Sequence, residues 1–276
     1  MGGGNTAKDY PLQYFGASAI AALLNYPLWR ASAIGQSAFH VPKYKYFTAA
    51  MSPYIFAMLP PYKGAVATVF GMTWARAAIF YGSDAGRDYL LTVHHCSEEF
   101  SIVFPPLIVS TLVQFINMPV VRATVTIQDP SSTLPNVWAS IKYIYATHGI
   151  KGLWHGTSAG ILKTVPKYCT AIIVKDLMEV YMKKPNPDLV TKEQYKFQTL
   201  YNSAIKSITA GIAGAVLTNP LDVIRNEMFK TNQSFIQTTK QLYNTTKYQF
   251  LIRGMGKNVV AVALPGTYTM HTMHIT

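Results

Sequence analysis

The chain has 276 residues, of which 50% are hydrophobic and only 13% are charged, against about 25% charged in an ordinary soluble domain. Its 24 lysines and arginines outweigh 12 acids, for a net charge of +12, which suits anionic lipids, anionic solutes or nucleic acid. No helix-turn-helix, zinc-finger or RNP-like pattern accompanies this charge, which argues against nucleic acid. Its two cysteines lie outside any C-x-x-C spacing and exclude a disulfide framework.

Five apolar stretches follow along the chain. Residues 11–29 and 104–121 carry no Asp, Glu, Lys or Arg, and after Lys257 the chain meets only two histidines. Residues 65–91 and 162–180 are apolar but contain several charged side chains. Each stretch is near the roughly 17 to 25 residues that a helix needs to cross a bilayer, and charges within a membrane usually face a bundle interior. The pattern predicts a helical membrane bundle with a polar interior.

Two short segments outside these stretches resemble functional motifs. The N-terminal "MGGGNT" places Gly2 and Thr6 as an N-myristoylation signal does, although a glycine tail is the simpler interpretation. The segment "HHCSEE", residues 94–99, is rich in metal-ligand types but lacks the spacing of a metal site, so we expect a solvated loop. No nucleotide-binding or nucleophile motif is present, which predicts that the chain is not an enzyme.

An internal repeat is the strongest feature of the sequence. The segments "NYPLWRASAIGQ" (25–36), "NMPVVRATVTIQ" (117–128) and "TNPLDVIRNEMF" (218–229) align proline on proline. A glycine recurs 37, 37 and 34 residues after these prolines. Three tandem units of about a hundred residues are the simplest explanation. The aligned positions are Pro27, Pro119 and Pro220, followed by Gly64, Gly156 and Gly254.

Two motifs within the repeats carry a family resemblance. "PLDVIR" (220–225) has the form proline, any residue, acid, two residues, base, and "THGIKGLWHG" (147–156) has the Gly, aromatic, base, Gly order, with histidines replacing its acid and base. On these motifs the chain resembles the mitochondrial carrier family. The resemblance implies an all-α membrane protein with six transmembrane helices in three tandem pseudo-threefold repeats, each with a short matrix helix. It also implies that the three repeated prolines kink their helices.

The resemblance further implies boundaries and location. The single carrier-like domain, residues 1–276, would divide into repeats near residues 10–100, 101–199 and 200–276. Spanning helices are expected near residues 11–35, 65–91, 103–128, 158–183, 200–227 and 256–275, with matrix segments near 38–63, 130–155 and 231–253. The protein would be a multi-pass protein of the mitochondrial inner membrane, with both termini toward the intermembrane space.

Carriers as a family close the matrix side with a ring of three inter-helix salt bridges, and most of that ring is missing here. Only Asp222 and Arg225 remain as a matrix gate remnant, and we expect them to pair within their helix or Asp222 to contact Arg30. Arg30 and Arg122 lie one residue past the missing acids and are expected to reach the matrix surface or a lipid phosphate. The replaced positions are Trp29, Ser32, Val121 and Thr124.

The family's gate on the intermembrane side is also incomplete. The resemblance leaves one conventional bridge, between Arg87 and Asp176, and a substitute pair of Glu179 with His274. The family's substrate positions, seven residues after each recurring glycine, fall on Gly71, Lys163 with Thr164, and Ala261. Of these only Lys163 could hold an anion directly, helped by Arg76 or Lys167, and a solvated charge without function is an equal alternative.

The recurring glycines suggest a lipid site. Backbone N–H groups at a helix N-terminus bind phosphate, and carriers use segments like these to hold cardiolipin. The resemblance therefore implies bound cardiolipin and other anionic lipids at Gly64, Gly156 and Gly254, with no other cofactor and no metal.

Two functions fit these observations. Degenerate gates and a nearly uncharged cavity favour a non-transporting structural or lipid-binding subunit of a large inner-membrane complex of the respiratory-chain type. In that hypothesis other membrane-protein subunits are its partners, and its 18 tyrosines and 13 phenylalanines would help to cover the interface. The alternative is an active mitochondrial solute carrier that moves a small anionic or neutral metabolite.

Overall fold

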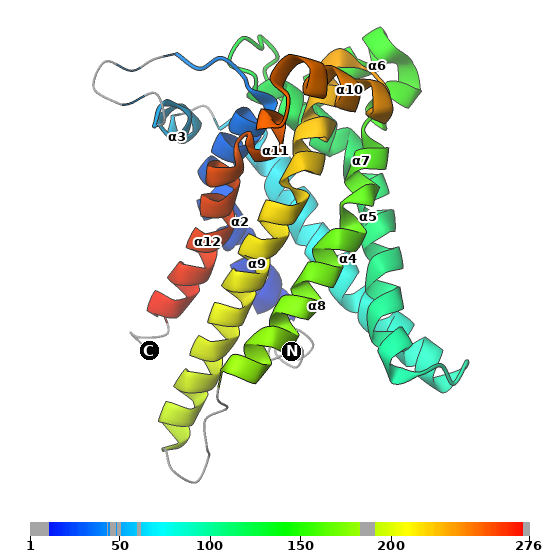
Figure 1. The fold of residues 1–276 in the computed structure, drawn as a ribbon, viewed down its shortest axis with the longest axis vertical. Coiled ribbons are helices and arrows are strands. Elements are labelled where there is room, and N and C mark those ends of the chain that lie inside the picture. Colours follow the sequence, from blue (N-terminus) through cyan, green and yellow to red (C-terminus); the bar gives the residue numbers. More distant parts are fainter. Residues whose placement is uncertain are drawn as a thin grey trace.

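A computed structural model describes residues 11–42, 44, 48, 51–59, 62–182 and 191–272. All regular elements in these residues are helices, and the long ones run side by side along the long axis of the molecule (Figure 1). The long helices are α2 (Pro11–Ser37), α4 (Ala65–Thr92), α5 (Glu98–Gln128), α8 (Thr164–Tyr181), α9 (Lys192–Thr231) and α12 (Met255–Thr272). The short ones are α3 (Ser52–Met58), α6 (Val137–Leu153), α7 (Thr157–Leu162), α10 (Phe235–Thr246) and α11 (Gln249–Ile252).

Most long helices lie within a few residues of the predicted spans, but α9 begins at Lys192 rather than near 200, and one span is divided. The span expected near 158–183 is divided at Lys163, where α7 ends and α8 begins. Helices α3, α6 and α10 gather at one end of the molecule, and the start of α2 and the end of α12 lie toward the other (Figure 1). The predicted joining segments therefore do contain short helices on a common side.

Two helices of the described chain are long and apolar enough to cross a membrane by length and composition. They are Glu98–Gln128 and Glu193–Thr231. The other expected spans do not pass this test. Residues 65–91 and 162–180 contain several charged side chains, which lower their mean hydropathy. The composition test thus supports two of the six predicted spans.

Side-chain caps fix where several helices begin. The hydroxyl of Ser97 accepts the N–H of Phe100 at the start of α5, so this helix begins inside the predicted loop 94–99. Thr191 and Ser234 start α9 and α10 with capping boxes, in which a glutamine three residues later bonds back to the cap. Each cap satisfies N–H groups that have no partner within the helix.

The repeated prolines all lie inside long helices. Pro27 is within α2, Pro119 within α5 and Pro220 within α9. Proline removes one helical hydrogen bond, and such a loss is tolerated in a membrane helix where neighbouring groups satisfy the freed carbonyl.

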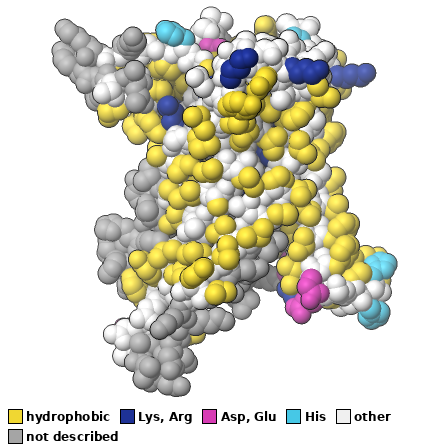
Figure 2. Space-filling view, in the orientation of Figure 1, with side chains coloured by type: hydrophobic (Ala, Val, Ile, Leu, Met, Phe, Trp, Pro, Cys, Tyr) yellow, Lys and Arg dark blue, Asp and Glu magenta, His cyan; other side chains and the backbone are white. Residues whose placement is uncertain are grey.

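The buried core lies where the C-terminal halves of α5 and α9 meet the short helices. One cluster joins Val223 and Met228 of α9 to Leu242 of α10, and another joins Ile127 of α5 to Ile144 of α6. Away from this end the long helices expose large apolar side chains, and Figure 2 shows them along the height of one face. Apolar groups turned outward suit a lipid environment.

Candidate functional site

The three recurring glycines share one backbone geometry. Gly64, Gly156 and Gly254 have φ of +85°, +88° and +69°, in the left-handed region that favours glycine. The carbonyl of each accepts the N–H four residues further on, at 2.9, 3.1 and 3.0 Å, so each glycine stands at the start of a helix: α4, α7 and α12. The sequence prediction that these glycines precede helices is therefore confirmed.

The same glycines make the same kind of close approach three times. A Cβ at Gly64 would lie 3.1 Å from Ile127 of α5, and one at Gly156 would lie 2.6 Å from Phe229 of α9. A Cβ at Gly254 would lie 2.5 Å from the backbone nitrogen of Gln36 in α2. The glycine of each unit thus packs against the proline-containing helix of the next unit. The glycine of the third unit packs against the proline-containing helix of the first.

A buried ionic cluster joins two residues predicted for different roles. Lys163 Nζ lies 2.7 Å from Asp222 Oδ1, and Arg225 Nη2 lies 2.9 Å from the same oxygen. The three side chains are 19%, 11% and 12% exposed. Lys163 stands at the junction of α7 and α8, and Asp222 lies in α9 two residues after Pro220. The expected substrate lysine and the gate remnant therefore form one cluster.

The charge balance of this cluster is uneven. Two cations share one carboxylate, which leaves a surplus of one positive charge in a mostly buried place, where an uncompensated charge is costly. The Arg225 Nε–H is buried and has no hydrogen-bond partner within the described part of the chain. Lys167, four residues after Lys163 and so on the same side of a helix, is exposed. The arrangement favours the approach of an anion.

The structure decides between two partners proposed for Asp222. The pair within α9, Asp222 with Arg225, is present, and Lys163 is a partner that motif spacing did not predict. Arg30 instead donates to the Leu59 carbonyl at 3.2 Å, and its guanidinium lies 4.7 Å from the centre of the Phe56 ring. The alternative contact between Asp222 and Arg30 is therefore wrong.

The prediction that Arg30 and Arg122 reach the surface is also wrong. They are only 4% and 1% exposed. Arg122 donates to the carbonyl of Gly152, which follows it in the same unit, and to Asn232 Oδ1 after α9 at 3.1 Å. Carbonyl oxygens offered by the short-helix end thus hold both guanidinium groups inside the protein.

The remaining predicted substrate positions are uncharged and buried or open. Thr164 is buried and its hydroxyl donates to the Gly160 carbonyl at 3.3 Å, while Ala261 is 2% exposed. No atom lies within 4 Å of where a Cβ would stand at Gly71. Lys163 is therefore the charged member of the predicted set.

A polar contact near Gly71 escaped the sequence analysis. Asn117 Oδ1 accepts the indole N–H of Trp74 at 2.8 Å, and Asn117 Nδ2 donates to the Gly71 carbonyl at 3.4 Å. This asparagine stands two residues before Pro119, as Asn25 stands before Pro27. The repeated Asn-x-Pro order was the available signal.

Away from the short helices, Arg87 Nη2 lies 3.2 Å from Glu98 Oε1, and the two side chains are 41% and 71% exposed. Such an exposed pair contributes little to stability. The side chains of Asp176, Glu179 and His274 lie outside the described residues, as do Gly2 and Thr6. The Arg87–Asp176 bridge and the pair of Glu179 with His274 therefore stay predictions.

A bundle of long helices with outward apolar side chains and an internal ionic cluster defines a helical membrane protein. Residues 107–186 match the family model described as mitochondrial carrier protein. In this part the chain is therefore similar to the mitochondrial carrier family. This similarity favours the mitochondrial inner membrane as its location.

Known relatives match part of the chain. It is 23% identical over 103 residues to mitochondrial brown fat uncoupling protein 1 of Ovis aries, covering 37% of this chain and 31% of the relative. It is 27% identical over 84 residues to the protein of that name from Canis lupus familiaris, covering 30% of this chain and 25% of the relative. The matched segment thus spans a third or less of each relative's length.

Proposed function

We propose that this chain is an active mitochondrial solute carrier for a small anionic or neutral metabolite, and that an anion suits its site better. The gate sequences favoured a non-transporting subunit of a respiratory-chain type complex. Two findings weigh against that hypothesis: the similarity to uncoupling protein 1, and a central lysine that is part of an ionic cluster rather than an isolated charge.

The architecture proposed with this function is six spanning helices in three units, near residues 10–100, 101–199 and 200–276. The glycine contact that occurs three times, and that closes from Gly254 back onto α2, supports a pseudo-threefold arrangement. We also propose that cardiolipin phosphates bind at the three glycines, because each begins a helix. The start of α2 and the end of α12 lie away from the short helices (Figure 1), which supports our proposal that both termini face the intermembrane space.

The single observation that carries the transport proposal is the Asp222 oxygen shared by Lys163 and Arg225. A carboxylate or phosphate oxygen entering the bundle would compete with Asp222 for one of these cations, and its charge would neutralise the surplus. Since Lys163 belongs to the α7–α8 junction and Asp222 to α9, this exchange would loosen one helix from the other. Solute binding would thereby change the helix arrangement.

Uptake into proteoliposomes tests the proposal. Purified protein is reconstituted and offered a panel of labelled carboxylates, phosphates and neutral metabolites, with wild type compared with Lys163→Met and the surface control Lys240→Met. We expect exchange of at least one anion, its loss in Lys163→Met and its retention in Lys240→Met. Uptake of a neutral solute that is indifferent to Lys163→Met would reject the anion assignment.

Purification of the native protein in mild detergent addresses the competing hypothesis. A carrier is expected to migrate apart from respiratory assemblies. If the protein remains in a complex of many subunits and no member of the solute panel is taken up, it is a structural subunit and the transport proposal is wrong.

A further inference from the structure

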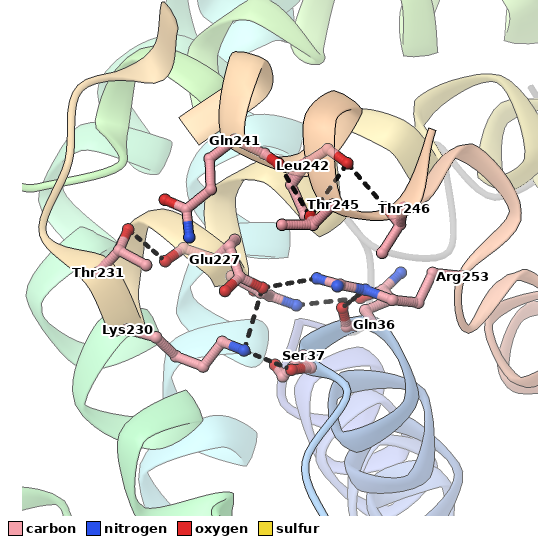
Figure 3. Close-up of polar contacts among 11 residues, drawn as sticks. Gln36, Ser37, Glu227, Lys230, Thr231, Gln241, Leu242, Thr245, Thr246 and Arg253 are labelled. Atoms are coloured by element: carbon pink, nitrogen blue, oxygen red, sulfur yellow. Dashed lines mark hydrogen bonds and ion pairs between the residues drawn. The ribbon is translucent and has the colours of Figure 1, made fainter. Parts of the chain in front are cut away.

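The end of α2 is held by two cations from the third unit (Figure 3). Arg253 Nε donates to the Gln36 carbonyl at 2.8 Å, and Lys230 Nζ donates to the Ser37 carbonyl at 2.8 Å. These carbonyls belong to the last turn of α2, where helical carbonyls lack a partner within the helix and carry a partial negative charge. Two successive carbonyls are therefore each held by a positive charge.

One carboxylate orients both cations. Glu227 Oε2 lies 2.8 Å from Arg253 Nη2 and 3.0 Å from Lys230 Nζ. Glu227 and Arg253 are 12% and 18% exposed, and Lys230 is 33% exposed. Glu227 and Lys230 stand one turn apart on α9, whereas Arg253 follows α11. We call Glu227, Lys230 and Arg253 the α2 clamp.

A layer of side-chain amides lies beside the clamp on the same helix pair. Gln36 Nε2 donates to Asn219 Oδ1 at 3.1 Å, and Asn226 Nδ2 donates to Gln36 Oε1 at 3.3 Å. Asn219 also donates to the carbonyls of Leu251 and Arg253, at 3.0 and 3.1 Å. The amides join α2, α9 and α11 without net charge, so the ionic part of the junction is confined to the clamp.

Helix α5, the proline-containing helix of the second unit, is attached differently. Among the ion pairs of the described residues, none links α5 to α2 or to α9. The second unit reaches the third through the Lys163–Asp222 pair of the ionic cluster, and at the short-helix end through Arg122 on Asn232 Oδ1 and His155 Nε2, 2.8 Å from the Gln233 carbonyl. Toward the first unit, Lys63 donates to the Ser132 carbonyl at 3.3 Å. The three junctions are therefore chemically unequal.

We propose that the α2 clamp closes the short-helix side of this protein, as a one-sided ionic closure between α2 and α9. Opening would separate Arg253 and Lys230 from the α2 carbonyls, while Glu227 keeps both cations in place for the return. The closure would stand in for a ring of inter-helix bridges that this chain cannot form. This inference concerns which helices separate and needs no solute, so it does not depend on the transport proposal.

Spin-label distances test the clamp in the full chain in detergent. Cys96 and Cys169 are replaced by serine, and one label pair is placed with His40→Cys and Lys240→Cys, beyond α2 and on α10. A second pair, Thr133→Cys with Lys240→Cys, reports on the α5 side. We expect one narrow distance distribution for the first pair, and a longer, broader one in Glu227→Gln with the second pair unchanged. Glu193→Gln, an exposed acid in the first turn of α9, is the matched control.

A second variant guards against loss of folding. Lys230→Gln leaves the Glu227–Arg253 pair and the Gln36 contact intact, so it should fold and broaden the α2 distances to a smaller extent. Circular dichroism checks helix content in each variant. If Glu227→Gln and Lys230→Gln keep the wild-type distance distribution, or if the α5 pair broadens in place of the α2 pair, the clamp is not the closure. If Glu227→Gln fails to fold, Lys230→Gln alone decides between these results.

Discussion

Asp222→Asn is the sharpest perturbation of the ionic cluster. It removes the negative charge that Lys163 and Arg225 share and leaves two cations in a mostly buried place. Both cationic nitrogens contact the same oxygen, at 2.7 and 2.9 Å, so they lie at most about 5.6 Å apart. At an effective dielectric constant of about 20, two unit charges at that separation repel by about 3 kcal/mol.

This repulsion agrees with the roughly 3 to 5 kcal/mol lost when one partner of a buried ion pair is removed. For a chain of this size, about 3 kcal/mol corresponds to a fall of roughly 6 to 12 °C in Tm. The Tm can be followed by tryptophan fluorescence or circular dichroism of purified protein in detergent. Asp88→Asn, which changes an exposed acid on α4, is the matched control.

The double variant Asp222→Asn with Lys163→Met supplies the internal check. It removes one of the two repelling cations, so we expect it to recover more than half of the loss in Tm. If Asp222→Asn has the same Tm as the control Asp88→Asn, or if the double variant has a lower Tm than Asp222→Asn, the three groups do not form the charged cluster described.

Further expectations follow from individual contacts. Gly156→Ala should destabilise the protein by roughly 1 to 3 kcal/mol, because the φ of Gly156 is +88° and a Cβ there would meet Phe229. Gly16→Ala, which has open space around it, should not destabilise the protein, and thermal unfolding compares the two variants. Burial and the nearby Arg122 charge lower the pKa of His155 from 6.5. The stability that this neutral histidine contributes is therefore present above pH 6.5 and lost as the pH falls through the lowered pKa, and His155→Gln should flatten the dependence of Tm on pH between about 5 and 7. Trp74→Phe should cost about 1 kcal/mol, measured as a lower Tm, because it leaves Asn117 without its indole donor.

The positions of the long helices were predictable because proline and glycine repeat in register and several stretches between them lack charge. Residues 11–35 were expected as a helix and Pro11–Ser37 is one, and 65–91 corresponds to Ala65–Thr92. The start of α9 was placed at 200 rather than 192 because the polar first turns hid it. The capping box of Thr191 and Gln194 was the signal that marks the true start.

The ionic contacts were harder to predict, because they join residues far apart in sequence and outside the shared motifs. Lys163 and Asp222 come from different units and different aligned positions, 59 residues apart. Arg122 was expected at the surface because the acid of its motif was missing, yet the Gly152 carbonyl and the side-chain oxygen of Asn232 accept its hydrogen bonds. Arg253 stands directly before a recurring glycine, as Lys63 and His155 do, but Glu227 aligns with Ile34 and Thr126 in the other units, so internal comparison did not single out the acid.

The contact of Gly254 with Gln36 also bears on how the protein is made. Arg253 and Gln36, which bond beside it, are 217 residues apart in the chain. During synthesis α2 must wait, without these final neighbours, until the chain has been made as far as Arg253. Contacts of such long sequence separation slow folding, so nascent α2 is a segment that needs protection by lipid or by an insertion chaperone.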